Sequence, residues 1–168
     1  MKNETQTVYL LLGSNLGDKI NALKEATEMI EAQIGKITAH SRFYETQAWG
    51  KTDQPDFINQ AIAVDTKLSP DAVLTAILLI EKELGRERTE KWAERIIDID
   101  ILLYGNLVVN KKDLVIPHPH LHERNFALVP LMESAGEEEH PVLHQTIEDI
   151  YFDCNDKLEV VLLEEDFS

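Results

Sequence analysis

The sequence predicts an α+β domain with the ferredoxin-like βαββαβ order: an antiparallel sheet with both helices on one face, plus further elements at its C-terminal end. The first observation is that short apolar stretches with strand character alternate with two stretches whose apolar residues repeat at helical spacing. The second is that the order strand, helix, strand occurs twice. Two such units combine into one sheet with both helices on the same side. The opposite face would then be open to bind a ligand.

The first unit begins with the apolar stretch at residues 7–12, which a Gly-Ser-Asn turn signal follows. Asp18 can cap a helix whose apolar residues share one face, and Gly35 can end that helix. Residues 36–45 are moderately apolar and predict the second strand.

The second unit begins at residues 57–66, where strict alternation places Phe57 and Asn59 on the open face of the sheet. A Ser-Pro pair at residues 69–70 is typical of an N-cap followed by the first helical position. The helix that it begins is expected to end at Gly85.

Residues 95–103 predict the last strand of this unit, and two carboxylates, Asp98 and Asp100, interrupt its aliphatic stretch. Side chains alternate across a strand, so both carboxylates share the open face, about 6.5–7 Å apart. Like charges at this spacing repel each other unless something positive lies between them. A solvated outer face and a site for a hard cation both explain the pair. Arg95, just upstream, favours a cation that is held together with an anion.

Two loops, at residues 46–56 and 85–94, show neither period. Structureless loops of this length are uncommon in compact domains and are usually functional, so we expect both near the open face. The second loop begins a stretch in which glutamates alternate with basic residues, namely Arg86, Arg88, Lys91 and Arg95. A solvated charged loop and an anion site both remain open for this stretch.

After the second unit the pattern predicts a short strand at residues 107–109 and a helix from Arg124 onward. A second helix is expected at 143–151 and a last strand at 158–163. We expect one domain over residues 1–168. In that domain residues 1–6 are a polar leader, and residues 133–168 are an acidic extension without an assigned role. Three histidines, His118, His120 and His122, suggest zinc, but no partner carboxylate pattern or cysteine follows them, so we do not favour that interpretation.

The composition excludes several classes of function. A formal net charge of −15 argues against nucleic acid and anionic membranes as partners, because both select a basic surface. No apolar stretch is long enough for a transmembrane helix, and the polar start of the chain lacks the apolar region of a signal peptide. A single cysteine, Cys154, excludes an internal disulfide. We expect a cytoplasmic monomer whose partners are small molecules.

Six short motifs follow one another along the chain: Gly-Ser-Asn-Leu at 13–16, Phe-Tyr-Glu-Thr at 43–46, Asp-Gln-Pro-Asp-Phe-Ile-Asn at 53–59, Gly-Arg-Glu-Arg at 85–88, Arg-Ile-Ile-Asp-Ile-Asp at 95–100 and Pro-His-Pro at 117–119. Together and in this order they resemble the 6-hydroxymethyl-7,8-dihydropterin pyrophosphokinase family of folate biosynthesis. The likeness runs from about Val8 to Met132.

The resemblance implies a ferredoxin-like fold and an ATP-dependent diphosphokinase. Such an enzyme transfers the terminal diphosphate of ATP to the hydroxymethyl group of the reduced pterin and releases AMP. Two Mg²⁺ ions would bridge the ATP phosphates, with Asp98 and Asp100 as their ligands. The implied catalytic residues are Arg86, Arg95 and Asp100. The implied ATP contacts are Glu81, Arg86, Arg88, Trp92, Arg95, Ile101, His118 and Arg124. The implied pterin contacts are Thr46, Gln47, Ala48, Trp49, Phe57, Asn59, Asp98 and Phe126.

The chain departs from the family pattern at Ala93-Glu94, where Gly-Pro is common, and at Gln47-Ala48, where many members have prolines. These changes bear on loop closure more than on chemistry, and no residue stands out as a general base. Two other functions remain possible. A nucleotidyltransferase would have the acidic pair close behind its Gly-Ser, whereas about 80 residues intervene here. A non-catalytic binding module would not need Asp98, Asp100 and Arg95 together.

Overall fold

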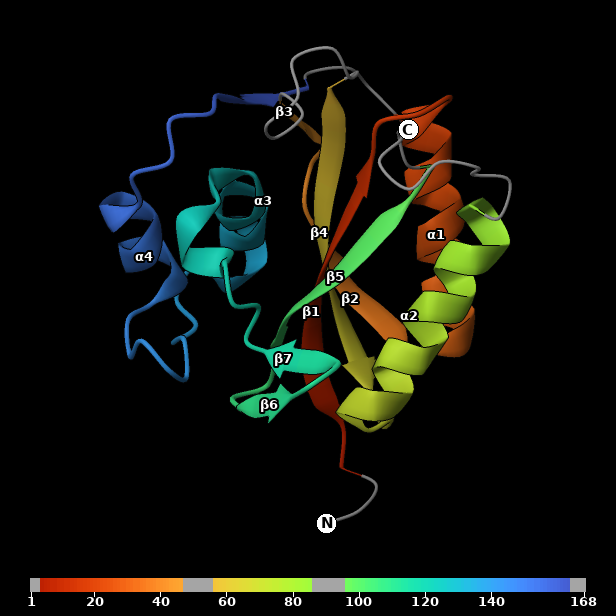
Figure 1. The fold of residues 1–168 in the computed structure, drawn as a ribbon, viewed down its shortest axis with the longest axis horizontal. Helices are drawn as coiled ribbons and strands as arrows, with labels where there is room; N and C mark the ends of the chain where they lie inside the picture. The colour runs from red at the N-terminus through yellow and green to blue at the C-terminus, as the bar shows by residue number, and fades with distance from the viewer. Residues whose placement is uncertain (1–3, 47–55, 86–95, 164–168) are drawn as a thin grey trace.

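A computed structural model describes residues 4–46, 56–85 and 96–163 of the chain. A central sheet carries helices on both faces (Figure 1). Up to the last central strand the elements are β1 (Gln6–Ser14), α1 (Lys19–Gln33), β2 (Lys36–His40), β3 (Tyr44–Thr46), β4 (Phe57–Thr66), α2 (Pro70–Gly85) and β5 (Asp98–Tyr104). The elements after it are β6 (Val109–Lys111), β7 (Leu114–Ile116), a 3₁₀ turn (Leu121–Glu123), α3 (Asn125–Ala135), α4 (Ile147–Asp153) and β8 (Val160–Leu162).

Within the described residues the sheet follows the order β5-β1-β4-β3-β8, and β2 also pairs with β4. Every pairing is antiparallel, as predicted. In the centre, Gly13 of β1 lies opposite Asn59 of β4 on one side and opposite Asp98 of β5 on the other. The register therefore brings three residues that are 39 to 85 positions apart in the sequence to the same level of the sheet.

The two predicted helices, α1 and α2, cover one face of the sheet, as expected. Their inner residues, such as Leu23 and Ile77, form one core with the inward side chains of the strands, including Leu10 and Ile62. Burial of these aliphatic side chains is the main driving force for this layer.

The opposite face is less open than the sequence predicts. Helices α3 and α4 cover part of it and form a second core, in which Leu128 and Leu131 pack with Leu11, Ala61 and Leu103 of the strands. Leu11 of β1 and Ala61 of β4 supply an apolar surface that a helix can cover. A pocket remains beside the start of α3, and both apolar and polar side chains line it.

Several element boundaries differ from the expectation. The strand expected at 36–45 is divided into β2 and β3 at Ser41. The Ser41 hydroxyl oxygen accepts a 2.9 Å hydrogen bond from the Ala61 amide, and the Ser41 amide donates a 2.8 Å bond to the Ala61 carbonyl. The strand expected at 107–109 begins later, as β6 (Val109–Lys111), and pairs with an unforeseen partner, β7. The last central strand begins at Asp98, and Arg95 lies outside the described residues.

The acidic extension joins the body of the fold through α4 and β8, both close to their expected positions. Thr146 caps α4 by accepting a bond from the Asp149 amide, and β8 pairs with β3. Among the described helices, none has the length and apolar character that crossing a membrane requires. The single-domain organisation of residues 1–168 stays a prediction.

Glu133 fastens α3 to the junction between β2 and β3. Its carboxylate accepts bonds from the Arg42 backbone amide at 3.2 Å, from Arg42 Nε at 3.0 Å and from the Tyr44 hydroxyl. The Tyr44 side chain is buried, and that burial, followed by the bond to Glu133, raises the pKa of its hydroxyl to about 12. The arrangement holds the helix that lines the pocket against the sheet.

Glu133→Ala is expected to lower the free energy of unfolding by about 1–3 kcal/mol, because it leaves the buried Tyr44 hydroxyl without an acceptor. Urea denaturation monitored by circular dichroism measures the change. Tyr44→Phe combined with Glu133→Ala should cost less than the sum of the two single changes, since the orphaned hydroxyl is then absent. Strict additivity would contradict this account of the contact.

Candidate active site

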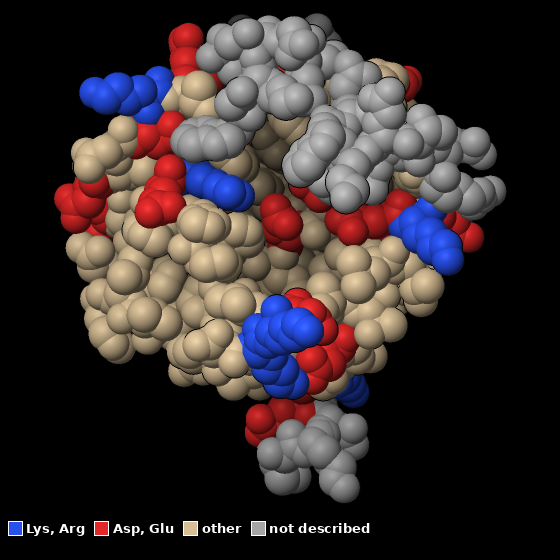
Figure 2. Space-filling model, in the orientation of Figure 1, with Lys and Arg blue, Asp and Glu red and all other residues tan. Residues whose placement is uncertain are grey.

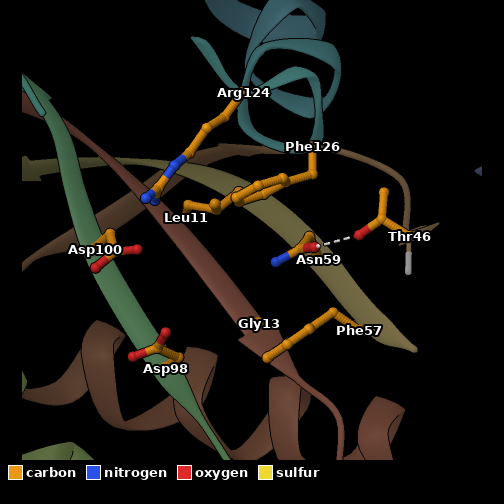
Figure 3. A pocket seen from close by; sticks show the side chains of 9 residues that line it. All are labelled: Leu11, Gly13, Thr46, Phe57, Asn59, Asp98, Asp100, Arg124 and Phe126. Carbon is orange, nitrogen blue, oxygen red and sulfur yellow. Dashed lines mark hydrogen bonds between the residues drawn. The ribbon is translucent and has the colours of Figure 1, made fainter. Parts of the chain in front are cut away.

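A pocket of about 170 Å³ lies on the α3 side of the sheet. Strands β1, β3, β4 and β5 and the start of α3 supply its lining, which consists of Leu11, Gly13, Thr46, Phe57, Asn59, Asp98, Asp100, Arg124 and Phe126 (Figure 3). Seven of these nine residues were predicted as site residues from the sequence. Leu11 and Gly13 were not predicted.

Two aromatic rings and an amide form one side of the pocket. Figure 3 shows Asn59 between the rings of Phe57 and Phe126. Both rings are half-buried, unlike the fully buried core residues, so each keeps surface available for a ligand. The Asn59 oxygen accepts a 3.5 Å bond from the Thr46 hydroxyl, and its nitrogen donates a 3.4 Å bond to the Leu12 carbonyl. These long bonds orient the amide and leave its remaining hydrogen-bonding capacity for a ligand.

Gly13 forms the floor beside this amide. A Cβ atom at position 13 would lie 2.5 Å from the Asn59 side-chain nitrogen, closer than two such atoms can approach. The sequence predicts a turn at Gly13 after the first strand, and this prediction is wrong, because β1 continues through Ser14. A glycine inside a strand often marks a close approach of another group, and this signal could have pointed to the pocket.

Asp98 and Asp100 form the opposite side of the pocket. Both point from β5 into it, while Ile97, Ile99 and Ile101 are buried, which confirms the predicted alternation. Figure 2 shows acidic side chains inside the hollow at the centre of this face, with a basic side chain at its edge. The carboxylate pair therefore belongs to a concave site and not to a plain solvated face.

The donor set suits a hard cation that shares its ligands with a substrate. Mg²⁺ prefers oxygen ligands, keeps several waters and is often held by one or two carboxylates together with phosphates. Within the described part of the chain, no group of three or more His, Cys, Asp and Glu side chains could hold a metal by itself. The same observation gives no support to the zinc interpretation. His120 contacts Glu123 at 2.9 Å.

A second pocket, of about 280 Å³, adjoins the outer side of β5. It is lined by Leu74, Ile77, Ile99, Asp100, Ile101, Lys112, Asp113, Leu114, Val115, His118 and Pro119. Asp100 lines both pockets, and two of the residues predicted for the nucleotide, Ile101 and His118, lie in this one.

His118 presents a fixed neutral ring. Its Nδ1 accepts a 3.1 Å bond from the His120 backbone amide, so in the neutral form the proton is on Nε2. Burial, and then the nearby positive charge of Arg124, lowers the pKa of His118 to about 4, although Asp98 acts in the opposite direction. The ring is a hydrogen-bond donor through Nε2 at neutral pH.

The lowered pKa predicts an acid-sensitive contribution to stability. The unfolded chain binds a proton at His118 near pH 6.5, whereas the folded chain resists it down to about pH 4. The contribution of His118 to the free energy of unfolding is fully present above pH 6.5 and is lost as the pH falls toward 4. We expect about 1–2 kcal/mol, allowing for the part of the ring that water reaches.

Urea denaturation at several pH values between 7 and 4.5 measures this contribution. His118→Asn keeps an acceptor for the His120 amide but cannot be protonated, so its stability should fall less steeply with acid. His140, whose pKa burial also lowers, contributes in the same direction to both proteins and cancels in the comparison. Equal slopes for the two proteins would contradict the lowered pKa of His118.

Two further predicted residues have defined contacts. The Arg124 guanidinium carbon lies 5.5 Å from the centre of the Phe126 ring, within the range of a cation–π contact. Glu81, predicted to contact the nucleotide, accepts a 2.7 Å bond from the backbone amide of Ile99. The other predicted residues lie outside the described ones, namely Gln47, Ala48, Trp49, Arg86, Arg88, Trp92 and Arg95.

The fold and the two pockets define an α+β protein with room for small molecules and with a carboxylate pair whose oxygens suit a hard cation. A family model described as 7,8-dihydro-6-hydroxymethylpterin-pyrophosphokinase matches residues 9–136. The chain belongs to this family. It is accordingly an ATP-dependent pyrophosphokinase of folate synthesis, which transfers diphosphate from ATP to hydroxymethyldihydropterin.

Two bacterial relatives carry the name 2-amino-4-hydroxy-6-hydroxymethyldihydropteridine pyrophosphokinase. The one from Methylorubrum extorquens is 48% identical over 128 residues, which are 76% of this chain and 81% of the relative. The one from Aquifex aeolicus is 41% identical over 143 residues, 85% of this chain and 89% of the relative. A crystal structure of Plasmodium falciparum HPPK-DHPS shares the fold, with a TM-score of 0.76 at 20% identity. The alignment covers 90% of this chain but only 46% of that one.

Proposed function

We propose that the two pockets on either side of Asp100 are the active site of the pyrophosphokinase reaction, which yields AMP and the pterin diphosphate. The observation that carries the proposal is the position of Asp100, which lines both pockets beside Asp98. Phosphates bound at the carboxylate pair would lie next to a slot for a flat ring. The two substrates would therefore meet where the cation is held.

The pterin occupies the first pocket. A flat bicyclic ring fits between Phe57 and Phe126, since aromatic side chains bury large apolar area and stack on rings. The amide of Asn59 and the hydroxyl of Thr46 supply hydrogen-bonding groups at the edge of that ring. Gln47, Ala48 and Trp49 remain predicted pterin contacts.

ATP extends from the second pocket toward the carboxylates. Ile101 offers an apolar wall, and His118 and Arg124 supply donors for the phosphates. Glu81 stays a predicted nucleotide contact, and its carboxylate accepts a bond from the β5 backbone. The remaining predicted nucleotide contacts are Arg86, Arg88, Trp92 and Arg95.

Asp98 and Asp100 would hold two Mg²⁺ ions. When bound, the ions would supply positive charge that neutralises the phosphate oxygens during transfer. A pterin in the aromatic slot would have its hydroxymethyl group near the floor at Gly13, which pairs with Asp98. Of the predicted catalytic residues, Arg86 and Arg95 complete the proposal as groups that neutralise the transferred diphosphate. No residue is assigned as a general base.

The proposal also covers the fold arrangement, the cellular compartment, the partners and the oligomeric state of the enzyme. Counting β2 and β3 as one strand, the order of the central strands supports the ferredoxin-like arrangement. The lone cysteine is compatible with the cytoplasm, and the net charge of −15 disfavours nucleic acid and anionic membranes as partners. A monomer suffices, because one chain supplies both pockets.

Product analysis tests the function. The protein is incubated with ATP, Mg²⁺ and 6-hydroxymethyl-7,8-dihydropterin, and phosphorus NMR follows the products. We expect AMP and pterin diphosphate in equal amounts, and neither without the pterin. ADP would indicate a simple kinase. Free pyrophosphate without pterin diphosphate would indicate a nucleotidyltransferase, and tight binding without turnover a binding module.

A further inference from the structure

The strand that carries both aspartates lies at one end of the sheet. Within the described residues β5 pairs with β1 alone, so its outer edge has no strand neighbour. Backbone groups on such an edge lack the ladder bonds that fix an inner strand. Two contacts replace that ladder. The His118 amide bonds to the Leu102 carbonyl at 3.0 Å, and the Ile99 amide bonds to a Glu81 carboxylate oxygen at 2.7 Å.

The second of these contacts, the bond to the Ile99 amide, lies between the two aspartates of the strand. Ile99 lies between Asp98 and Asp100, and its amide belongs to the peptide plane that joins it to Asp98. The orientation of this plane helps to set the direction in which both carboxylates leave the strand. A bond at this amide therefore constrains the relative positions of the two carboxylates.

The helix that supplies Glu81 is firmly seated. Val73, Ile77 and Ile80 on the inner side of α2 are fully or almost fully buried in the core beneath β5. Glu81 directly follows Ile80, and its carboxylate reaches the strand edge at a distance typical of a charge-assisted bond. Because the core fixes α2 beneath β5, it also fixes the position of the Glu81 carboxylate relative to the aspartate pair.

We propose that Glu81 is a positioning residue that fixes the peptide between the two aspartates and so sets the geometry of the cation site. This inference rests on the proposed role of Asp98 and Asp100. Catalytic groups must be held to a fraction of an ångström, and a displacement of about 1 Å can cost about 100-fold in rate. Glu81 acts through its bond to the Ile99 amide and not through the nucleotide.

Three variants separate this role from a nucleotide contact. Glu81→Ala removes the acceptor, Glu81→Gln keeps an acceptor without the charge, and Glu83→Ala removes an exposed carboxylate from the same helix as a control. We expect Glu81→Ala to lower kcat at least tenfold and to raise the Mg²⁺ concentration needed for half-maximal rate several-fold. Its pterin affinity, and its ATP affinity without Mg²⁺, should stay within twofold of the wild type. Glu81→Gln should retain at least a third of the rate, and Glu83→Ala all of it.

Amide hydrogen exchange at Ile99 gives a readout that does not depend on the reaction. We expect slow exchange in the wild type and in Glu81→Gln, and at least tenfold faster exchange in Glu81→Ala. Weaker ATP binding by Glu81→Ala with unchanged kcat and exchange would overturn the proposal in favour of a nucleotide contact. An inactive Glu81→Gln with slow exchange would overturn it too, and this test holds even if the alanine variant does not fold. If the exchange behaves as expected but Asp98→Ala is fully active, the proposed function of the pair fails and the bond to Ile99 stands.

Discussion

Asp98→Ala and Asp100→Ala are each expected to lower kcat by about 1000-fold or more, equivalent to about 4 kcal/mol of transition-state stabilisation. Both carboxylates line the pocket, and within the described residues no cluster of three or more His, Cys, Asp and Glu side chains could take over a metal. Steady-state kinetics at saturating ATP and pterin measure the loss.

The fold should survive both changes. Both side chains line a pocket and belong to neither hydrophobic core, so the free energy of unfolding should change little. Glu25→Ala, which removes an exposed carboxylate from α1, serves as the control and should keep full activity. An active Asp98→Ala or Asp100→Ala would show that the pair has a structural role instead.

Phe57→Ala is expected to weaken pterin binding by about 30–100-fold, or about 2–3 kcal/mol, from the loss of one buried stacking surface. ATP affinity should change less than twofold, because Phe57 lines the first pocket and not the second. Calorimetric titration with each ligand separately measures both affinities.

Phe152→Ala provides the matched control, since the Phe152 side chain is 71% exposed on α4 and belongs to neither pocket. It should leave both affinities unchanged. An equal loss of pterin and ATP binding in Phe57→Ala, together with a large loss of stability, would mean that the ring is mainly a core residue. Unchanged pterin binding would mean that the pterin does not use this slot.

The strands with clear alternation could be predicted from the sequence. The bounds of β4 are as predicted, and so is the face of β5 that carries the two aspartates. Both follow from period-two alternation, which reports the two faces of a strand. The cover of the second face could not be predicted. It depends on how α3 and α4 pack against Leu11 and Ala61, which are distant in the sequence.

Part of the site could likewise be predicted from the sequence, and part could not. Seven of the residues that the resemblance implies for the site line one pocket, namely Thr46, Phe57, Asn59, Asp98, Asp100, Arg124 and Phe126. Gly13 was missed because a glycine at the end of an apolar stretch has the same sequence signal whether it begins a turn or forms a pocket floor. The bond between Glu81 and Ile99 was also missed, since no sequence pattern reports a side chain that caps a backbone edge.

The floor at Gly13 has a consequence for inhibitors of this enzyme. A compound that rests on it touches main-chain atoms, and no side chain is available there to be exchanged for a bulkier one. Any larger residue at this position would meet the Asn59 amide at 2.5 Å and displace it. A resistance mutation at Gly13 would therefore damage recognition of the natural substrate together with that of the drug. Compounds built around this contact should be difficult for a cell to evade.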